Sequence, residues 1–162
     1  MVNEIFTYNS ENIDIDKEDE ITNIARSAAG NPNISEKMAR KCAAEGSGLE
    51  MEISMNPGCS ANVLNELSHH GESYIRESVA KNLNTSVETL NNLLKDKDEN
   101  VKNAAQNGMI KKHALSFASR VHPDIDFSKM PPEFRDKLRD CDPEDIRNII
   151  HGYTYWVQDH KG

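Results

Sequence analysis

Cysteine, glycine and long apolar runs are all scarce in this chain of 162 residues. Its three cysteines, Cys42, Cys59 and Cys141, are an odd number without a C-x-x-C pair, so neither a disulfide framework nor a structural zinc site is expected. Cys42 lies on a predicted core face, where a thiol acts as a small hydrophobic group. No apolar run approaches the roughly 18 residues that a membrane-spanning helix needs, so we expect no membrane partner.

Sequence patterns of catalysis are missing as well. The chain has no G-x-S-x-G turn, no G-x-x-x-x-G-K-[ST] phosphate loop and no G-x-G-x-x-G motif. Its six histidines form no H-E-x-x-H motif, and the side chains of adjacent His69 and His70 would diverge on a helix. We therefore expect no catalytic residues, no cofactor and no metal site, and the chain is not predicted to be an enzyme.

Acidic residues exceed basic ones, giving a net charge of −8, and most of the excess lies near the N-terminus. Residues 1–20 hold seven acids and one lysine, whereas residues 21–162 are nearly balanced. We interpret residues 1–19 as an acidic, partly flexible segment with too little apolar surface to fold. This segment also lacks the basic start and apolar stretch of a secretory signal, so a cytoplasmic location is expected.

An internal repeat is the main feature that the chain does have. Asparagines recur at intervals of 25, 26 and 25 residues, namely Asn31, Asn56, Asn82 and Asn107. The first three are each followed four residues later by a serine that can cap a helix, namely Ser35, Ser60 and Ser86. Small or apolar pairs three residues apart then follow on one helical face: Ala39 and Cys42, Leu64 and Leu67, Leu90 and Leu93. Each serine is therefore predicted to start a helix.

A second apolar-periodic segment precedes each asparagine. Its core positions are Ile24 and Ala28, Leu49 and Ile53, Ile75 and Val79, and Val101 with Ala104 and Ala105. Asn-Pro stops the first two of these helices, and Gly30, Asn82 and Asn107-Gly108 are expected to supply left-handed terminating residues. Because one two-helix unit cannot bury its apolar face alone, residues 20–108 are predicted to stack into a short right-handed α-solenoid of an all-α protein.

The segment YIRESVAKNLNTSVETLNNLLKDKDENVKNAAQNG, residues 74–108, resembles the leucine-rich repeat variant (LRV) family. The matching positions are Arg76, Val79, Ala80, Asn82, Ser86, Leu90, Leu93, Asp96 and Asp98, and the match is weaker over residues 21–73. The resemblance implies α-helices alternating with short 3₁₀ helices in a superhelix related to HEAT and armadillo repeats. It implies no enzyme. Some relatives carry a cysteine-ligated iron–sulfur module, but the cysteines here are not clustered, so no iron is expected.

The repeat ends after Asn107, and residues 109–162 are predicted to form C-terminal helices that pack on the repeats as part of one domain. A stripe of Ile110, Ala114, Phe117 and Val121 is expected to cover the end of the repeat core. The segment Asp142-Pro143-Glu144-Asp145 predicts another helix start. Its apolar stripe, Ile146, Ile149, Ile150, Tyr153, Trp156 and Val157, is either packed against the repeats or an exposed docking surface.

These features favour a non-catalytic, protein-binding helical-repeat module, in which an acidic chain could act as an inhibitor or immunity-type protein. Its partner is expected to contact solvent-facing polar positions, namely Arg40, Lys41, Asn65, Glu66, Glu77, Asn91 and Asn92. The alternative is a HEAT-like protein that contacts the backbone of DNA or RNA through Arg40, Lys41, Arg76, Lys81, Lys102 and Lys111. Against it, residues 31–120 hold 11 bases and 11 acids, and Tyr74 is the sole aromatic residue between positions 21 and 110.

Overall fold

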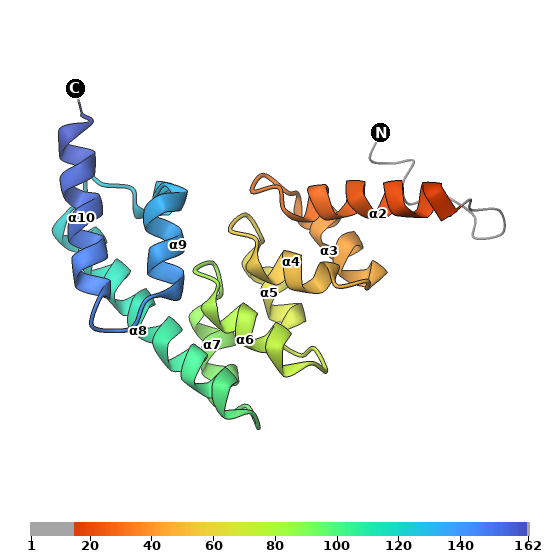
Figure 1. The fold of residues 1–162 in the computed structure, drawn as a ribbon. Coiled ribbons are helices and arrows are strands. Elements are labelled where there is room, and N and C mark those ends of the chain that lie inside the picture. Colours follow the sequence, from red (N-terminus) through yellow and green to blue (C-terminus); the bar gives the residue numbers. More distant parts are fainter. Residues whose placement is uncertain (1–14, 162) are drawn as a thin grey trace.

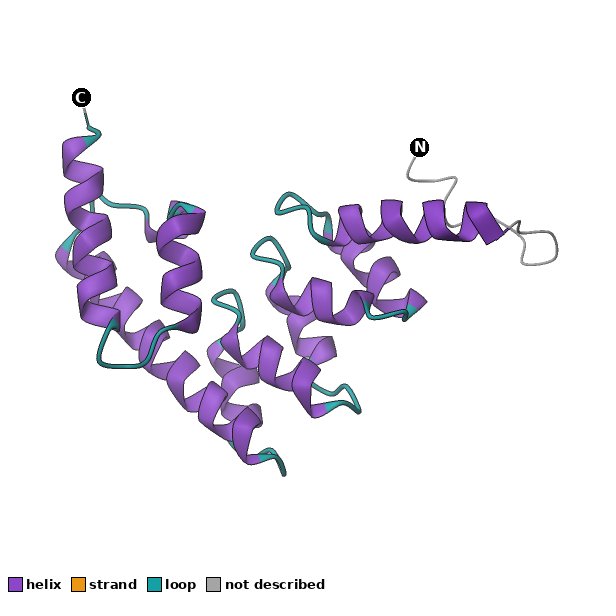
Figure 2. Ribbon diagram, in the orientation of Figure 1, coloured by secondary structure: helices purple, strands orange, loops and turns teal. Residues whose placement is uncertain are grey.

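The computed structural model describes residues 15–161, which form nine α-helices and one short 3₁₀ helix, with no β-strand among them (Figure 1). Figure 2 shows that short loops join the helices throughout this range. The predicted all-α class is therefore confirmed. The first six helices are α2 (Ile15–Ala29), α3 (Glu36–Glu45), α4 (Leu49–Met55), α5 (Ala61–Leu67), α6 (Ser73–Lys81) and α7 (Val87–Leu93).

The three predicted serine caps are all present. The hydroxyl oxygens of Ser35, Ser60 and Ser86 accept hydrogen bonds of 3.1–3.3 Å from the backbone N–H groups three residues further on. Each hydroxyl satisfies a donor that the first helical turn leaves without an intrahelical partner. Helices α3, α5 and α7 therefore begin directly after these serines.

Helices α2 to α7 and the first half of α8 (Glu99–Val121) enclose one hydrophobic core. Each helix contacts the next along the chain, and α2, α4, α6 and α8 also contact one another in turn. All six predicted core residues after the serines are buried, from Ala39 to Leu93. The first segment differs from its prediction, because Ile24 is 42% exposed and Ala25 and Ala29 are buried instead. The smaller alanines let α2 lie close to its neighbours α3 and α4.

The repeated asparagines connect neighbouring helix pairs through their side-chain amides. The Nδ2 group of Asn56 donates to the backbone carbonyls of Ala29 and of Asn31, the latter at 2.9 Å. One unit further on, Nδ2 of Asn82 donates to the carbonyls of Ser54 at 2.9 Å and of Asn56 at 3.0 Å. We call this series the asparagine ladder. It supplies a donor to the carbonyls of Ala29 and Ser54 at the ends of α2 and α4. The carbonyls of Asn31 and Asn56 gain a second donor, since each also accepts from a backbone N–H three residues further on.

The left-handed conformation expected at the end of the helix before Asn82 is not found. Asn82 has φ −68°, and within residues 15–161 positive φ values occur at Gly46, Ser47 and Gly48, in the turn between α3 and α4. The Oδ1 atom of Asn82 accepts from the N–H of Asn84 at 2.9 Å. Because the side chain ends the helix through its own hydrogen bonds, a left-handed residue is not needed there.

The predicted helix end at Asn107-Gly108 is wrong, since α8 continues without interruption from Glu99 to Val121. A Cβ atom on Gly108 would lie 2.7 Å from the carbonyl oxygen of Ala80 and 3.0 Å from Cδ2 of Leu90. The missing side chain therefore lets α8 approach α6 closely, which is a packing role instead of a terminating one. After the rungs at Asn56 and Asn82, Asn107 forms no third rung with the described residues, because it lies within the helix.

Two further expectations differ from the structure. Residues 15–108 contain α-helices and no 3₁₀ helix, so the alternation implied by the LRV resemblance is absent from this range. Residues 15–19 belong to α2, whereas the sequence predicts that they are part of the flexible acidic segment. Once the helix has nucleated, each added residue gains a backbone hydrogen bond, which favours this extension. The rest of that segment, residues 1–14, lies outside the described residues.

The C-terminal part contains a 3₁₀ helix η1 (Phe127–Lys129) and the helices α9 (Pro132–Asp140) and α10 (Ile146–Asp159). They enclose a second hydrophobic cluster with the second half of α8. Helix α10 packs on α8 and α9, and its stripe is buried at Ile146, Ile150 and Tyr153. Helix α10 begins later than predicted, because residues 143–145 form a turn closed by the N–H of Asp145 and the carbonyl of Asp142.

Candidate functional site

Several of the polar residues predicted to contact a partner are bonded to other side chains of the protein. Arg40 on α3 forms ion pairs with Glu36 at 2.5 Å and with Glu66 on α5 at 2.8 Å. The pKa of Glu36 lies below its ordinary value because the Ser60 hydroxyl and the Arg40 guanidinium bond to its carboxylate. Arg40 and Glu66 are exposed, but their charges neutralise each other across two helix pairs.

The other predicted contact residues fall into two groups. Asn65 accepts a 3.0 Å hydrogen bond from the Thr89 hydroxyl, Glu77 pairs with Lys81 at 2.6 Å, and Lys41 also interacts with its surroundings. Asn91 and Asn92 are exposed on α7 and make no side-chain hydrogen bond within residues 15–161. Asn65 therefore connects α5 to α7, whereas Glu77 pairs within α6, and these positions do not gather around a cavity.

The basic stripe considered for nucleic acid is also compensated. Besides Arg40 and Lys81, Arg76 pairs with Asp96 at 2.7 Å and Lys102 with Glu99 at 2.5 Å. Lys111 is 4% exposed, and its Nζ donates to the carbonyl of Arg139 at 2.6 Å. A phosphate backbone needs cations that are free to replace its counterions, so this arrangement does not favour the alternative.

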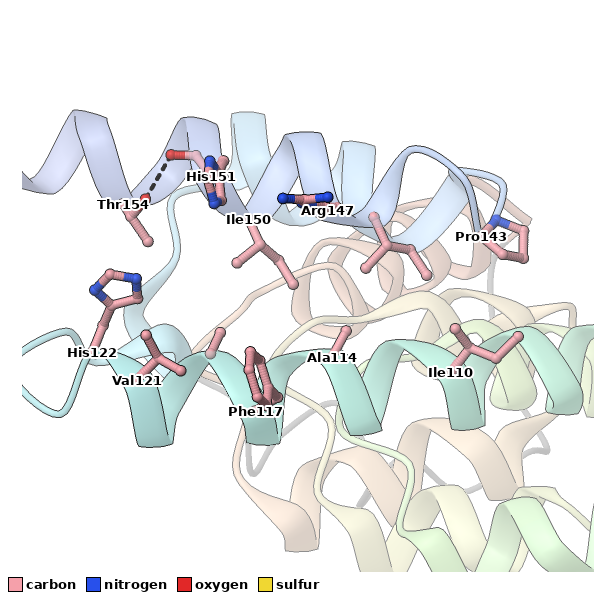
Figure 3. Close-up of a pocket in the computed structure, with 12 residues that line it drawn as sticks. Ile110, Ala114, Phe117, Val121, His122, Pro143, Arg147, Ile150, His151 and Thr154 are labelled. Atoms are coloured by element: carbon pink, nitrogen blue, oxygen red, sulfur yellow. Dashed lines mark hydrogen bonds between the residues drawn. The ribbon is translucent and has the colours of Figure 1, made fainter.

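A groove between the second half of α8 and α10 is the strongest candidate for a binding site (Figure 3). Its volume is about 430 Å³. The lining residues are Ile110, Ala114, Phe117, Ala118, Val121 and His122 from α8 and its end, and Pro143, Ile146, Arg147, Ile150, His151 and Thr154 from α10 and the turn before it. Both helices run in the same direction along the groove (Figure 3).

The α8 side of the groove carries large apolar side chains that remain in contact with water. Phe117 is 62% exposed, Val121 53% and Ile110 39%. Their spacing along the chain places them on one side of the helix, and Figure 3 shows them along the α8 edge. The stripe predicted to cover the repeat core therefore lines this groove instead, while Lys111 and Ala118 are the buried positions of this half of α8.

The α10 side combines a buried floor with a polar edge. Ile146 and Ile150 are buried at the floor, whereas Arg147 and His151 are exposed at the edge. The hydroxyl of Thr154 donates to the carbonyl of His151 at 2.7 Å, so it is satisfied within the helix (Figure 3). No lining residue is a carboxylate, and Arg147 has no ion-pair partner within residues 15–161. The groove is therefore apolar with a basic edge.

The remaining candidates for chemistry are dispersed. Within residues 15–161, no group of three or more histidine, cysteine or acidic side chains is placed to hold a metal ion. Cys42 is fully buried, as predicted, and Cys59 is buried as well. Burial raises the pKa of Cys59 to about 11, so its thiol is poorly suited to act as a nucleophile. Across the same residues, no helix has the length and apolar character to span a membrane.

Comparisons with known proteins add no assignment, because no family model, no curated protein and no solved structure matches the chain. The groove was not predicted from the sequence. The apolar stripes of residues 110–121 and 146–157 can both be recognised in the sequence. Sequence spacing does not show, however, which of the two apolar faces remains uncovered. The signal that could have indicated it is that two such stripes lie next to each other in a short C-terminal region.

Proposed function

We propose that the chain is a non-catalytic protein-binding module whose groove between α8 and α10 binds an amphipathic helix of a protein partner. In this proposal, the stacked helix pairs are a short right-handed α-solenoid of the LRV or HEAT type, and its C-terminal helices carry the binding site. The observation that carries the proposal is the exposure of Phe117, Val121 and Ile110 beside a concave apolar floor. Exposed apolar side chains gathered in this way mark interaction sites.

The dimensions of the groove favour a helical ligand. Ile110 and Val121 lie eleven residues apart on one helix, which corresponds to about 16 Å at ~1.5 Å per residue. That length matches about three turns of a partner helix, which would present anchors at spacings of three and four residues. Phe117 is the expected main contact, because large aromatic side chains dominate the energetics of interfaces.

The charge of the groove edge specifies the partner further. Arg147, His122 and His151 lie at the edge, and the guanidinium of Arg120 lies 5.9 Å from the centre of the Phe117 ring. Since no carboxylate lines the groove, acidic residues beside the apolar face of the ligand would meet complementary charge. The proposed ligand is therefore an amphipathic helix with acidic flanks. An inhibitor or immunity-type role in the cytoplasm is consistent with such binding and stays a prediction.

A selection from a library of helical peptides tests this function. Peptides would be selected on the wild-type chain and counter-selected on the variant Phe117→Ser/Val121→Ser, which alters exposed side chains and should fold normally. The variant Tyr74→Ser is the matched control, because Tyr74 is 52% exposed on α6 and lies outside the groove. Recovered peptides should carry apolar residues three and four apart with flanking aspartate or glutamate.

Affinity measurements on these peptides decide the outcome. By fluorescence anisotropy, the groove variant should weaken binding at least about tenfold, which corresponds to the loss of one aromatic anchor, while Tyr74→Ser should change little. The proposal fails if the selected peptides bind the groove variant as well as the wild type. A steep salt-dependent shift of labelled DNA by the same protein would instead favour the nucleic-acid alternative.

A further inference from the structure

A second cavity, of about 610 Å³, lies between the loop that precedes α5 and the helices α8 and α9. It shares no lining residue with the groove described above. Two cations line it, Lys112 from α8 and Arg135 from α9, and no carboxylate does. We call it the cationic cavity. Its volume falls within the range of roughly 300–1,000 Å³ that is common for small-molecule sites.

Lys112 and Arg135 differ from the other cations of the described residues. Most of those are either exposed or bonded to a partner, as Lys111 is to the carbonyl of Arg139 at 2.6 Å. Lys112 and Arg135 are both half-buried, yet within residues 15–161 neither forms an ion pair or a side-chain hydrogen bond. The Nε atom of Arg135 is the one buried side-chain nitrogen or oxygen in this range without a hydrogen-bond partner. The two half-buried cations without a partner therefore line the same cavity.

Such an arrangement has an energetic cost in the free protein. A buried donor without an acceptor loses its hydration and gains nothing in return. Burial also lowers the pKa of Lys112, and no neighbouring carboxylate counteracts this effect. An anion in the cavity would satisfy both side chains through charge-assisted hydrogen bonds.

The surroundings of the two cations suit an organic anion. Glu36 and Asp126 have partners of their own, since Glu36 pairs with Arg40, and Asp126 bonds to Ser128 and Lys129. The Ser116 hydroxyl lines the cavity and is free to donate within the described structure. Apolar side chains complete the lining, among them Leu115, Phe127 and Leu138. The cavity thus offers cationic groups beside an apolar surface.

We propose that the cationic cavity binds a small organic anion whose phosphate or carboxylate group lies between Lys112 and Arg135. The apolar lining would hold the body of the same molecule. Because the two sites share no residues, this binding is independent of the peptide-binding function proposed above, and each can fail without the other.

Three probes that share an aromatic ring distinguish phosphate binding, carboxylate binding and binding of the ring alone. They are phenyl phosphate, benzoate and uncharged phenol. Each would be titrated into ¹⁵N-labelled full-length protein at constant ionic strength and followed by NMR. The Nε–H signal of Arg135 should shift saturably with phenyl phosphate or benzoate and should not shift with phenol. The tighter of the two anions identifies the class of the natural ligand.

Variants locate the site. Followed by the backbone amide signals of residues that line the cavity, Lys112→Gln and Arg135→Gln should each weaken anion binding at least about tenfold, as expected for the loss of a charge-assisted hydrogen bond. Lys137→Gln is the control, because Lys137 is an exposed cation on the same helix α9 and does not line the cavity. Phe117→Ser should also leave anion binding unchanged. The proposal is overturned if neither anion binds at millimolar concentration, or if both cavity variants bind as well as the wild type.

Discussion

The guanidinium of Arg76 holds both carboxylate oxygens of Asp96, with its Nε 2.7 Å from Oδ2 and its Nη2 2.9 Å from Oδ1. The remaining nitrogen, Nη1, donates to the carbonyls of His70 and Gly71. Arg76 is 6% exposed, so this ion pair is shielded from solvent. It joins the loop before α6 to the loop before α8, two turns that lie on the same side of neighbouring helix pairs.

Asp96→Asn is expected to lower the free energy of unfolding by about 3–5 kcal/mol, because it leaves the buried Arg76 charge unpaired. Glu77→Gln, which breaks the more exposed pair with Lys81, should cost less than about 1 kcal/mol. Urea unfolding monitored by circular dichroism measures both. Equal losses of unfolding free energy in the two variants would show that the buried Arg76–Asp96 pair contributes no more to stability than the exposed pair.

The same pair predicts a pH dependence. Hydrogen bonds from Arg76 hold the pKa of Asp96 below its ordinary value, so the folded state keeps this carboxylate charged to lower pH than the unfolded chain does. Its contribution is fully present above the unfolded pKa of about 3.9 and is lost as the pH falls through the folded pKa. Between about pH 5 and pH 2, wild-type stability should therefore fall more steeply than that of Asp96→Asn. Parallel curves would contradict this assignment.

The asparagine ladder predicts unequal effects for identical substitutions. Asn82→Ala removes two hydrogen bonds to the buried end of α4 and should cost about 2–4 kcal/mol, since the buried Ser54 carbonyl loses its donor and the Asn56 carbonyl keeps only the N–H of Cys59. Asn31→Ala removes a single local bond, from the N–H of Asn33, and should cost about 1 kcal/mol or less. Urea midpoints compare the two. A larger loss for Asn31→Ala would refute the ladder.

Replacing either of two helical glycines by alanine should change the stability of the protein, but in opposite directions. Alanine normally stabilises a helix by up to about 1 kcal/mol relative to glycine, and Gly152→Ala on α10 should do so, because its Cβ would lie 3.6 Å from Phe134. Gly108→Ala should instead destabilise by about 1–3 kcal/mol, since its Cβ would approach the Ala80 carbonyl to 2.7 Å. Thermal unfolding of both variants is the measurement, and stabilisation by Gly108→Ala would argue against close packing of α8 on α6.

The cysteines should differ in reactivity toward a thiol reagent. Cys59 is fully buried with a pKa of about 11, whereas Cys141 is half-buried. Near pH ~8, alkylation followed by mass spectrometry should therefore modify Cys141 first, and Cys59 at a rate set by opening of the structure. Adding urea should remove this difference. Equal rates in the native protein would show that the region around Cys59 opens readily.

Local signals predicted the starts of α3, α5 and α7 well because their causes are local. A serine hydroxyl caps the N–H groups three residues away, and an apolar pair three residues apart shares a helix face, so α3, α5 and α7 could be placed from the sequence. The weakest predictions involved Asn107-Gly108 and the start of α10. In both segments, residues that often end or begin helices have other roles once neighbouring helices pack against them.

For the candidate groove, the sequence predicted only that its residues are apolar and did not predict where they lie in the fold. The stripe from Ile110 to Val121 was recognised as apolar, but its expected partner was the repeat core. Rotation of α8 about its axis decides which stripe is covered, and in the structure Gly108 faces Ala80 and Leu90. The lack of partners at Lys112 and Arg135 likewise had no sequence signal, because a cation without a partner is defined by what surrounds it.

The sequence by itself determined an all-α chain with a period of about 25 residues, capped by serines and interrupted at asparagines. These properties follow from interactions between residues that are close along the chain. The tertiary structure alone decided that the asparagine amides join successive helix pairs, that α8 leaves an apolar groove open beside α10, and that two unpartnered cations share one cavity. Each of these depends on contacts between segments distant in sequence, whose geometry no local pattern records.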